Sequence, residues 1–269
     1  MPELPDLEAI QDFLLRELVG VTVTGVTVVQ PIPIRMPGPA DFAGELTGQR
    51  LAGVRRRGKF LLLDWESGST LALNPMLTGR LQYCSPGERR KAKTCFILEL
   101  DDGHQLRYYD QKLMGKAYLV PDGRVELIPR WGEMGPEALS PEVTLAVFRQ
   151  RLRRHPGQVK NILVNDTFVA GIGNAYADEI LFAARIYPYR RRTSLSPAEV
   201  EALYAAMHAV LDHATAVVAG RMGDDIHVKV RDFLQVHGKG GAPCPYCGNV
   251  ISQITANQRL TNFCRRCQV

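Results

Sequence analysis

The sequence predicts an α+β protein of more than one domain, and three observations support this class. The chain has 269 residues, which is enough for two domains that each bury a stable core. Between residue 1 and about residue 125, one amphipathic helix precedes short apolar runs that alternate as strands do. Beyond residue 140 the apolar residues follow helical spacing, and two closely spaced cysteine pairs end the chain.

The N-terminal half predicts one helix and a mostly antiparallel sheet. A helix is expected over residues 5–18, where helical spacing is followed by Leu7, Ile10, Phe13, Leu14 and Leu18. Residues 21–24 and 26–28 alternate as a pair of strands would, and prolines mark residues 32–39 as a loop. Further strands are expected at residues 60–65, 70–73, 81–84, 95–100, 105–109 and 116–120.

The C-terminal half predicts helices, which follow a connection rich in proline and glycine. They are expected at residues 144–153, 158–164, 174–184 and 196–218. The last helix begins with Ser196, Pro197 and Glu199, a capping box with proline in the first helical position. We therefore predict a β domain over 1–127, a linker over 128–139, a helical domain over 140–236 and a cysteine ribbon over 237–269.

Composition and charge indicate a soluble protein that binds a polyanion. No run approaches the roughly 18 apolar residues of a membrane span, and the acidic N-terminus is unlike a signal peptide. We therefore expect a cytoplasmic protein with no membrane partner. The net charge is +5, and basic residues cluster at 55–59, 151–154 and 190–192 and after Asp232. Each cluster alone fits a solvated surface, but four of them favour a phosphate backbone.

Four cysteines near the C-terminus form the most specific motif. Cys244 and Cys247 make one CxxC knuckle, and Cys264 and Cys267 make a second one 16 residues later. This spacing predicts one closed, structural Zn²⁺ site, which supplies folding free energy to a ribbon too small for a core of its own. Two disulfides are the alternative, which a cytoplasmic location disfavours. The loop between the knuckles is expected to be a β-hairpin that presents Arg259 near its tip.

A turn with two glycines, residues 169–176, lies between two predicted helices. Gly171 and Gly173 permit a tight turn with positive φ. Amide N–H groups at the start of the following helix can bind a phosphate, and Asn174 can cap that helix or donate to the same phosphate. The alternative is an ordinary helix–helix turn, although this arrangement is also used to bind DNA.

The N-terminus carries a candidate nucleophile. If Met1 is removed, Pro2 becomes the first residue, and its nitrogen is a secondary amine that can attack an aldehyde carbon. An α-amino group has a pKa near ~8 against about 10.4 for lysine, so more of it is unprotonated at neutral pH. Glu3 lies beside it as a proton donor and acceptor. The alternative is a simple helix start, in which Pro5 has its usual place in the first turn.

Five motifs in order make the chain resemble the formamidopyrimidine-DNA glycosylase and endonuclease VIII family, as a divergent member. They are Pro-Glu-Leu-Pro-x-x-Glu at 2–8, Arg-Arg-Gly-Lys at 56–59, Gly-Pro-Glu at 135–137, Ala-Gly-Ile-Gly-Asn-x-Tyr-Ala-Asp-Glu at 170–179 and Gln-Arg-x-Thr-x-Phe-Cys-x-x-Cys-Gln at 258–268. The resemblance spans almost the whole chain. It implies an N-terminal β-sandwich that carries a helix, a helix-two-turn-helix domain and a zinc ribbon, with DNA in a basic cleft between the two domains.

The resemblance implies a bifunctional DNA glycosylase and abasic-site lyase of base-excision repair. Pro2 would attack C1′ of the flipped nucleotide to form a Schiff base, and Glu3 would protonate the sugar and shuttle protons. The strand would then be cut by β,δ-elimination. Lys59 would approach the lesion and its phosphate, while Asn174 and Arg259 would grip the flanking phosphates.

The implied partner is double-stranded DNA with a damaged base or an abasic site, bound by a monomer. The implied location is the bacterial cytoplasm, in association with the nucleoid. Lys160 matches a family lysine before the glycine turn, so we expect it to contact DNA as well. The only cofactor expected is the structural zinc ion.

Two segments depart from the family pattern at the positions that read the lesion. Residues 74–79 are Asn-Pro-Met-Leu-Thr-Gly instead of His-Leu-x-Met-Ser/Thr-Gly, so Leu77 or Met76 would fill the hole left by the flipped base. Asp-Pro-Arg-Arg-Phe-Gly has become Asp-Gln-Lys-Leu-Met-Gly, in which Met114 is an apolar wedge. Leu113 replaces the arginine that pairs with the orphaned base, and this change affects opposite-base selectivity.

A third departure concerns the lesion itself. Residues 220–236 are too few for the loop that covers flipped 8-oxoguanine in typical formamidopyrimidine-DNA glycosylases. We expect excision of formamidopyrimidines, with 8-oxoguanine as a further candidate. Two alternatives stay open: a family member that acts mainly on oxidised pyrimidines or abasic sites, and a damage-binding protein without excision activity. The intact Pro2, Glu3 and Lys59 disfavour the second alternative.

Overall fold

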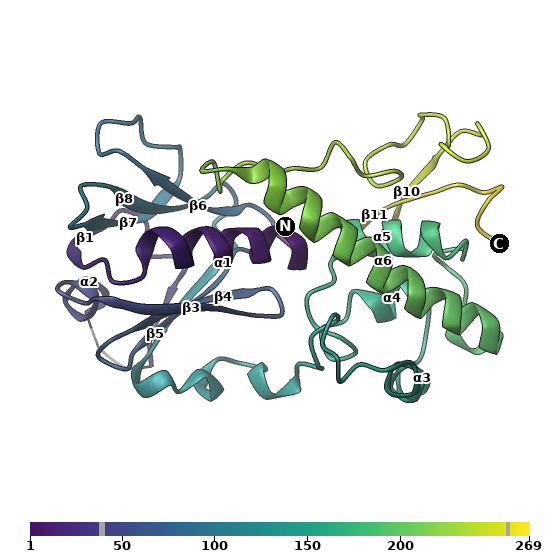
Figure 1. Cartoon of the computed structure of the whole chain (residues 1–269), viewed down its shortest axis with the longest axis horizontal. Coiled ribbons are helices and arrows are strands. Elements are labelled where there is room, and N and C mark those ends of the chain that lie inside the picture. Colours follow the sequence, from purple (N-terminus) through teal and green to yellow (C-terminus); the bar gives the residue numbers. More distant parts are fainter. Residues whose placement is uncertain (38–40, 257–258) are drawn as a thin grey trace. The chain divides into compact units, whose positions relative to one another are not determined.

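The computed structural model describes residues 1–37, 41–256 and 259–269, and it divides into two compact units (Figure 1). The N-terminal unit comprises Met1–Gly132 and Val218–Lys229, and the C-terminal unit comprises Glu133–Val217 and Val230–Val269. The domain boundaries expected from the sequence stay a prediction, and the two units differ from them: the first unit extends to Gly132, and the helical and ribbon segments fall in one unit. Residues 218–229, expected in the helical domain, belong to the N-terminal unit.

The N-terminal unit is built on two β-sheets, which confirms the predicted α+β class. The sheets have the strand orders β1-β7-β8-β6 and β2-β9-β5-β4-β3. Strands β2 and β9 pair in parallel, whereas β4 pairs with both of its neighbours in antiparallel fashion. The strands are β1 (Val23–Val28), β2 (Ile34–Arg35), β3 (Leu51–Arg57), β4 (Phe60–Trp65), β5 (Thr70–Asn74), β6 (Gly79–Cys84), β7 (Thr94–Leu100), β8 (Gln105–Asp110) and β9 (Lys116–Val120).

Helix α1 (Leu4–Leu18) places the N-terminus of the chain against strand β3. Its apolar residues recur every three or four positions, so that one face is buried, including Leu7, Ile10 and Leu14. Pro5 stands in the first turn, where its missing N–H would have no helical partner. The expected helix over residues 5–18 is therefore confirmed, and the buried face fixes the position of the residues that precede it.

Two connections cross from one sheet to the other at the same end of the N-terminal unit. Residues 75–78 join β5 to β6, and residues 111–115 join β8 to β9. Strands β6 and β8 pair with Gly79 opposite Asp110, so the two connections lie side by side. A Cβ added at Gly79 or Gly115 would lie 2.2 or 1.8 Å from the hydroxyl of buried Tyr108. Only glycine permits this close approach.

The C-terminal unit is helical and ends in a small two-stranded sheet. Helices α4 and α5, with the glycine turn between them, form the expected helix-turn-helix arrangement, and strands β10 and β11 form the expected hairpin. The elements are α3 (Leu145–Arg154), α4 (Val159–Leu163), α5 (Asn174–Ala183), α6 (Pro197–Met222), β10 (Ser252–Ala256) and β11 (Arg259–Phe263).

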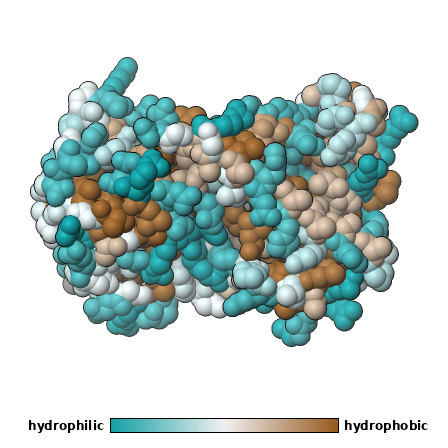
Figure 2. All heavy atoms as spheres, viewed as in Figure 1, coloured by the Kyte–Doolittle hydropathy of each residue, from teal (hydrophilic) through white to brown (hydrophobic). Residues whose placement is uncertain are grey.

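Helix α6 is long and apolar enough to cross a membrane by length and composition alone. Its buried residues recur every three or four positions, however, as in Leu203, Met207, Leu211 and Ala214. One face of α6 is therefore buried against the protein. On the molecular face drawn in Figure 2, apolar residues likewise gather in separate patches among hydrophilic ones.

The structure corrects three expectations about local structure. Residues 21–24 and 26–28 do not form a strand pair, because residues 23–28 make one strand, β1, with a register shift at Gly25. Strand β3 was not expected, since a register shift between Leu51 and Gly53 places the buried residues Leu51 and Val54 three positions apart, which breaks the alternation of a strand. The short helix α2 (Phe42–Leu46), capped by Asp41, was also not expected.

We predict that Gly115→Ala lowers the free energy of unfolding by about 1–3 kcal/mol, because the added methyl group overlaps the buried Tyr108 hydroxyl. Urea unfolding followed by circular dichroism measures this change. Gly87→Ala is the matched control, since a Cβ there meets nothing within 4 Å. Adding Tyr108→Phe should restore part of the loss, as it removes a hydroxyl without a hydrogen-bond partner in the described chain. Equal stability of the two alanine variants would contradict the prediction.

Candidate functional sites

The start of α1 holds Pro2 and Glu3 in a buried position. The backbone N–H of Glu3 donates to Asp6 Oδ2 at 2.8 Å, and its carbonyl oxygen accepts from the N–H of Leu7 at 3.0 Å. Asp6 is itself only 4% exposed, so this carboxylate fixes the backbone beside Pro2 from inside the protein. Asp6 was not among the residues expected to have a function. Its position three residues after Glu3 is typical of a capping box and could have identified it from the sequence.

Lys59 lies in the two-residue turn between β3 and β4, and helix α1 is tied to this turn. Gly58 has a φ of 56°, and the Lys59 side chain is buried. Arg56 donates to the Gly58 carbonyl oxygen at 2.9 Å, and its guanidinium contacts the Glu8 carboxylate of α1 at 2.7 Å. Because Glu8 is about one and a half helical turns beyond Glu3, this ion pair links the turn to the same helix.

The two sheet-crossing connections present exposed side chains at this end of the sandwich. Leu77 and Met114 are each 43% exposed, whereas Leu113 is half-buried with a φ of 51°. Buried Asp110 accepts hydrogen bonds from the hydroxyl of Thr78 and, at 2.6 Å, from the N–H of Gly115. One carboxylate therefore holds both connections. The pairing of β4 with β5 brings the Lys59 turn to the same end of the sandwich.

In the C-terminal unit, the turn between α4 and α5 is held by two other segments. Gly135 N–H donates to the Asp166 carbonyl oxygen at 2.8 Å, and Ala170 N–H donates to the Pro136 carbonyl oxygen at 2.8 Å. Arg151 of α3 donates to the carbonyl oxygens of Thr167 and Phe168, each at 2.6 Å. Burial lowers the pKa of Arg151. The Gly-Pro-Glu motif and an α3 arginine therefore fix the shape of the glycine turn.

Asn174 and Lys160 both point toward the ribbon hairpin. Asn174 Nδ2 and Lys160 Nζ donate to the Leu260 carbonyl oxygen at 2.7 and 3.0 Å. Lys160 Nζ also donates to Thr261 Oγ1 and contacts Asp178 Oδ1, each at 2.7 Å, and its side chain is 5% exposed. Three protein oxygens thus surround the ammonium that was expected to contact DNA. The contact of Lys160 with DNA stays a prediction. In the structure, Lys160 also holds the ribbon hairpin against α4 and α5.

Two adjacent carboxylates of α5 clamp the segment that leads into the ribbon. Asp178 accepts from the Asn262 N–H at 3.1 Å and contacts His237 Nδ1 at 2.8 Å. Glu179 accepts backbone N–H groups of Gln235, Val236 and His237 at 2.7–2.9 Å. Burial raises the pKa of Glu179, although the three N–H groups act in the opposite direction. The sequence shows both acids only as part of a motif, because these partners are 56 or more residues away in the chain.

Arg259 begins strand β11 and lines a cavity of about 230 Å³ with Lys160, Asn161 and Tyr189. The guanidinium is exposed and forms no hydrogen bond or ion pair with the part of the chain that the structure describes. It is therefore available to an external anion, as expected from the sequence. Gln258, the preceding residue of the motif, lies outside the described residues.

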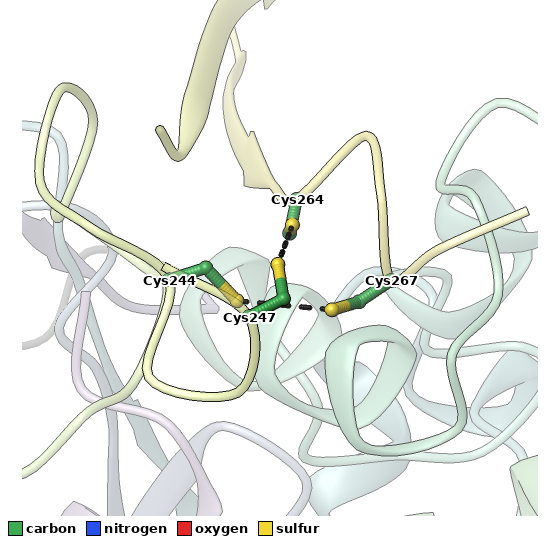
Figure 3. A group of neighbouring side chains, drawn as sticks. All are labelled: Cys244, Cys247, Cys264 and Cys267. Carbon is green, nitrogen blue, oxygen red and sulfur yellow. Dashed lines mark hydrogen bonds between the residues drawn. The ribbon is translucent and has the colours of Figure 1, made fainter. Parts of the chain in front are cut away.

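The four cysteines of the two knuckles converge on one point, with their sulfur atoms directed toward one another (Figure 3). All four Sγ atoms lie within 4.8 Å of one another, with Cys244–Cys267 at 3.8 Å and Cys247–Cys264 at 3.6 Å. Tetrahedral zinc with Zn–S bonds of about 2.3 Å requires sulfur atoms about 3.8 Å apart, so the site fits zinc and not two disulfides. A hydrogen bond with the Asn249 backbone lowers the pKa of Cys247 to about 7.

Three family models together match most of the chain. The formamidopyrimidine-DNA glycosylase N-terminal domain matches residues 1–117, and the formamidopyrimidine-DNA glycosylase H2TH domain matches residues 134–225. The zinc finger found in FPG and IleRS matches residues 241–269.

Relatives and solved structures agree with these matches. A formamidopyrimidine-DNA glycosylase of Symbiobacterium thermophilum is 39% identical over 100% of this chain and 89% of its own length. Lactococcus lactis Fpg bound to DNA with an abasic site has a TM-score of 0.90, at 28% identity over 99% of both chains. The same enzyme bound to DNA that contains Fapy-dG has a TM-score of 0.89, at the same identity and coverage.

We predict one zinc ion per chain in the purified protein, measured by inductively coupled plasma mass spectrometry. Cys264→Ser should lose the metal, because a structural site needs all four thiolates. Buried Cys264 also packs with Phe182 and Ile251, so metal loss should make the ribbon susceptible to proteolysis. Cys84→Ser is the control, since Cys84 lies in strand β6 outside the cluster. A full zinc content in Cys264→Ser would contradict the assignment.

Proposed function

Because the chain belongs to the formamidopyrimidine-DNA glycosylase family, we propose that it excises oxidised bases from DNA through Pro2 and Glu3. It is a DNA glycosylase with abasic-site lyase activity, and its partner is DNA with a damaged base or an abasic site. The observation that carries the assignment to these residues is the buried, hydrogen-bonded start of α1, tied by Glu8 and Arg56 to the turn that bears Lys59.

The reaction starts at the nitrogen of Pro2 once Met1 has been removed. The lone pair of this secondary amine attacks C1′ of the flipped nucleotide, and the bond from C1′ to the base breaks with its electron pair leaving on the base, which takes up the proton that the amine loses. Glu3 protonates the sugar ring oxygen as the ring opens, which leaves an iminium between Pro2 and C1′. Proton loss from C2′ then expels the 3′ phosphate, and a second elimination expels the 5′ phosphate.

The structure supports this chemistry by fixing the backbone of both residues. Two hydrogen bonds hold Glu3, so the amine of Pro2 needs little reorganisation before it attacks. Lys59 supplies a cation at the same end of the sandwich, where it neutralises the phosphate beside the lesion. Its buried stem is kept in place by the Arg56 bond to the Gly58 carbonyl oxygen.

The C-terminal unit supplies the grip on the DNA backbone. Arg259 is exposed at the start of β11 and donates to a phosphate, while the amides of the glycine turn and Asn174 approach a second phosphate. Lys160 supports this grip by holding the hairpin carbonyl of Leu260. Flipping a base costs a few kcal/mol, and contacts with flanking phosphates offset that cost.

The residues that would recognise the lesion differ from the family pattern. Met114 and Leu77 form an exposed apolar pair on adjacent connections, suited to wedge into the base stack. Leu113 offers no side-chain donor, so the protein reads the opposite base weakly. Formamidopyrimidines are the proposed substrates, with 8-oxoguanine as a further candidate. A preference for oxidised pyrimidines or abasic sites is the alternative, because residues 220–236 are too few for the loop that covers 8-oxoguanine in typical members of the family.

The zinc ion, held by Cys244, Cys247, Cys264 and Cys267, has a structural function. Bound there, it neutralises thiolates and closes the ribbon that presents Arg259. The relatives are bacterial proteins that act on DNA, and this protein is a soluble protein of the same kind. We propose that it lies in the cytoplasm and associates with the nucleoid.

Borohydride trapping tests the nucleophile, using protein whose N-terminal mass shows that Met1 is absent. We expect a covalent adduct that maps to Pro2 on duplexes with an abasic site or a formamidopyrimidine. Glu3→Gln should lower base excision at least about 100-fold and leave DNA affinity unchanged, because it removes a proton donor. Glu17→Gln, near the exposed end of the same helix, is the control.

Any other trapping result would change the proposed function or the proposed nucleophile. Trapping on the abasic duplex alone would replace the proposal with a lyase that no longer excises bases. No adduct on any duplex would favour the damage-binding alternative. An adduct that maps to Lys59 would move the nucleophile away from Pro2.

A comparison of Arg259→Ala with Lys160→Met separates DNA contact from support. Arg259→Ala should weaken binding to all duplexes alike and leave the melting temperature of the protein unchanged. The slope of the logarithm of the binding constant against the logarithm of salt concentration should fall by about one. Lys160→Met should lower the free energy of unfolding by about 3–5 kcal/mol, because it leaves buried Asp178 without its cation. Titrations at several salt concentrations and thermal unfolding measure both. An unchanged melting temperature with a smaller salt slope would instead make Lys160 a direct DNA contact.

A further inference from the structure

The C-terminal unit has a cavity of about 420 Å³ that the proposed chemistry does not use. It lies between helix α3, residues 192–195 and the first turn of α6, which are neighbours in the lower part of Figure 1. Its apolar lining comes from Leu152, Leu195, Pro197 and Val200. Its polar lining comes from Thr193 and three arginines, Arg149, Arg153 and Arg192.

The positive charge of this cavity is only partly balanced. Glu201 contacts Arg149 at 3.3 Å, but it is 64% exposed and turned to solvent. Glu199, which also lies near the start of α6, already accepts hydrogen bonds from Arg190 and from the N–H of Ser196. Among the described residues, neither Arg153 nor Arg192 has a side-chain hydrogen bond or an ion pair. The positive end of the 26-residue helix α6 adds to the same field.

Two guanidinium groups carry buried donors with no acceptor. The Nε atoms of Arg149 and Arg192 are buried without a hydrogen-bond partner in the part of the chain that is described. A buried donor left without a partner costs free energy, so these positions favour an incoming oxygen. Carboxylates bind guanidinium groups with short, charge-assisted and often paired hydrogen bonds.

The apolar lining distinguishes the occupant from a nucleic acid backbone. A phosphate backbone presents charge and sugar but no large apolar group that could cover Leu152 and Leu195. Ligand sites of this size combine an apolar wall with a few polar groups that fix orientation. An acidic peptide segment with one large apolar side chain satisfies both parts of the cavity.

We propose that this cavity, lined by Arg149, Arg153 and Arg192 over Leu152 and Leu195, binds a short acidic segment of a partner protein. One apolar side chain of the segment enters the cavity, and carboxylates beside it pair with the arginines. Arg153 and Arg192 belong to the basic clusters at 151–154 and 190–192, but none of the lining residues is among those proposed to react or to grip the flanking phosphates. The site therefore allows the enzyme to be held by a partner protein while it is bound to DNA.

Fluorescence anisotropy tests the site on the zinc-loaded full chain, with the labelled peptide Gly-Asp-Asp-Asp-Leu-Phe as probe. Saturable binding is expected, and it should weaken at least about tenfold in Arg153→Gln/Arg192→Gln, since charge-assisted hydrogen bonds are lost. Arg154→Gln/Arg191→Gln is the matched control, because it removes the same charge from neighbouring exposed positions that do not line the cavity. Peptides with Asn for Asp, or Ser for Leu and Phe, should also bind at least about tenfold more weakly.

Three results would overturn the proposal. The first is the absence of saturable peptide binding, and the second is equal weakening by the two double variants. The third is displacement of the peptide by an undamaged duplex, together with a loss of duplex affinity in Arg153→Gln/Arg192→Gln, which would make the cavity a DNA contact. Borohydride trapping on an abasic duplex should be unchanged in this variant. Failure of the catalytic proposal and failure of this one are therefore distinguishable.

Discussion

The C-terminal unit depends on two buried acids at the centre of α5. Asp178 and Glu179 are adjacent in sequence, yet their partners are Lys160 of α4, His237 and the backbone N–H groups of residues 235–237 and 262. Removal of either acid would leave several buried donors without acceptors, at a cost larger than that of most single contacts. The helix-turn-helix arrangement and the zinc ribbon are thus one structure, although Asp178 and Asn262 are 84 residues apart in the sequence.

The N-terminal unit uses the same principle at smaller scale. Asp6 fixes the backbone next to Pro2, and Asp110 holds the two connections that present Leu77 and Met114. In each case a buried carboxylate accepts a backbone N–H group beside the functional residues, so the backbone that carries them cannot move freely. The acids that organise the site therefore differ from the residues proposed to react or to contact DNA.

The differences between expected and observed structure have identifiable physical causes. Strand β3 was missed because its two buried residues, Leu51 and Val54, are three positions apart across a register shift, so the sequence shows no alternation there. The expected strand pair at residues 21–28 is a single strand because the irregularity at Gly25 shifts register without turning the chain. Helices and later strands were found within a few residues of their ends, since their apolar spacing is regular and uninterrupted.

The sequence by itself determined the family and the four zinc ligands, because motif order and the spacing of cysteines are properties of the linear chain. It also named Pro2, Glu3 and Arg259 as candidates by residue type. Only the tertiary structure decided that Lys160 is enclosed by Asp178 and the ribbon, and that three arginines share one cavity. Burial and hydrogen-bond partners arise between residues up to about 100 positions apart, as for Lys160 and Leu260, and no local pattern encodes such pairs.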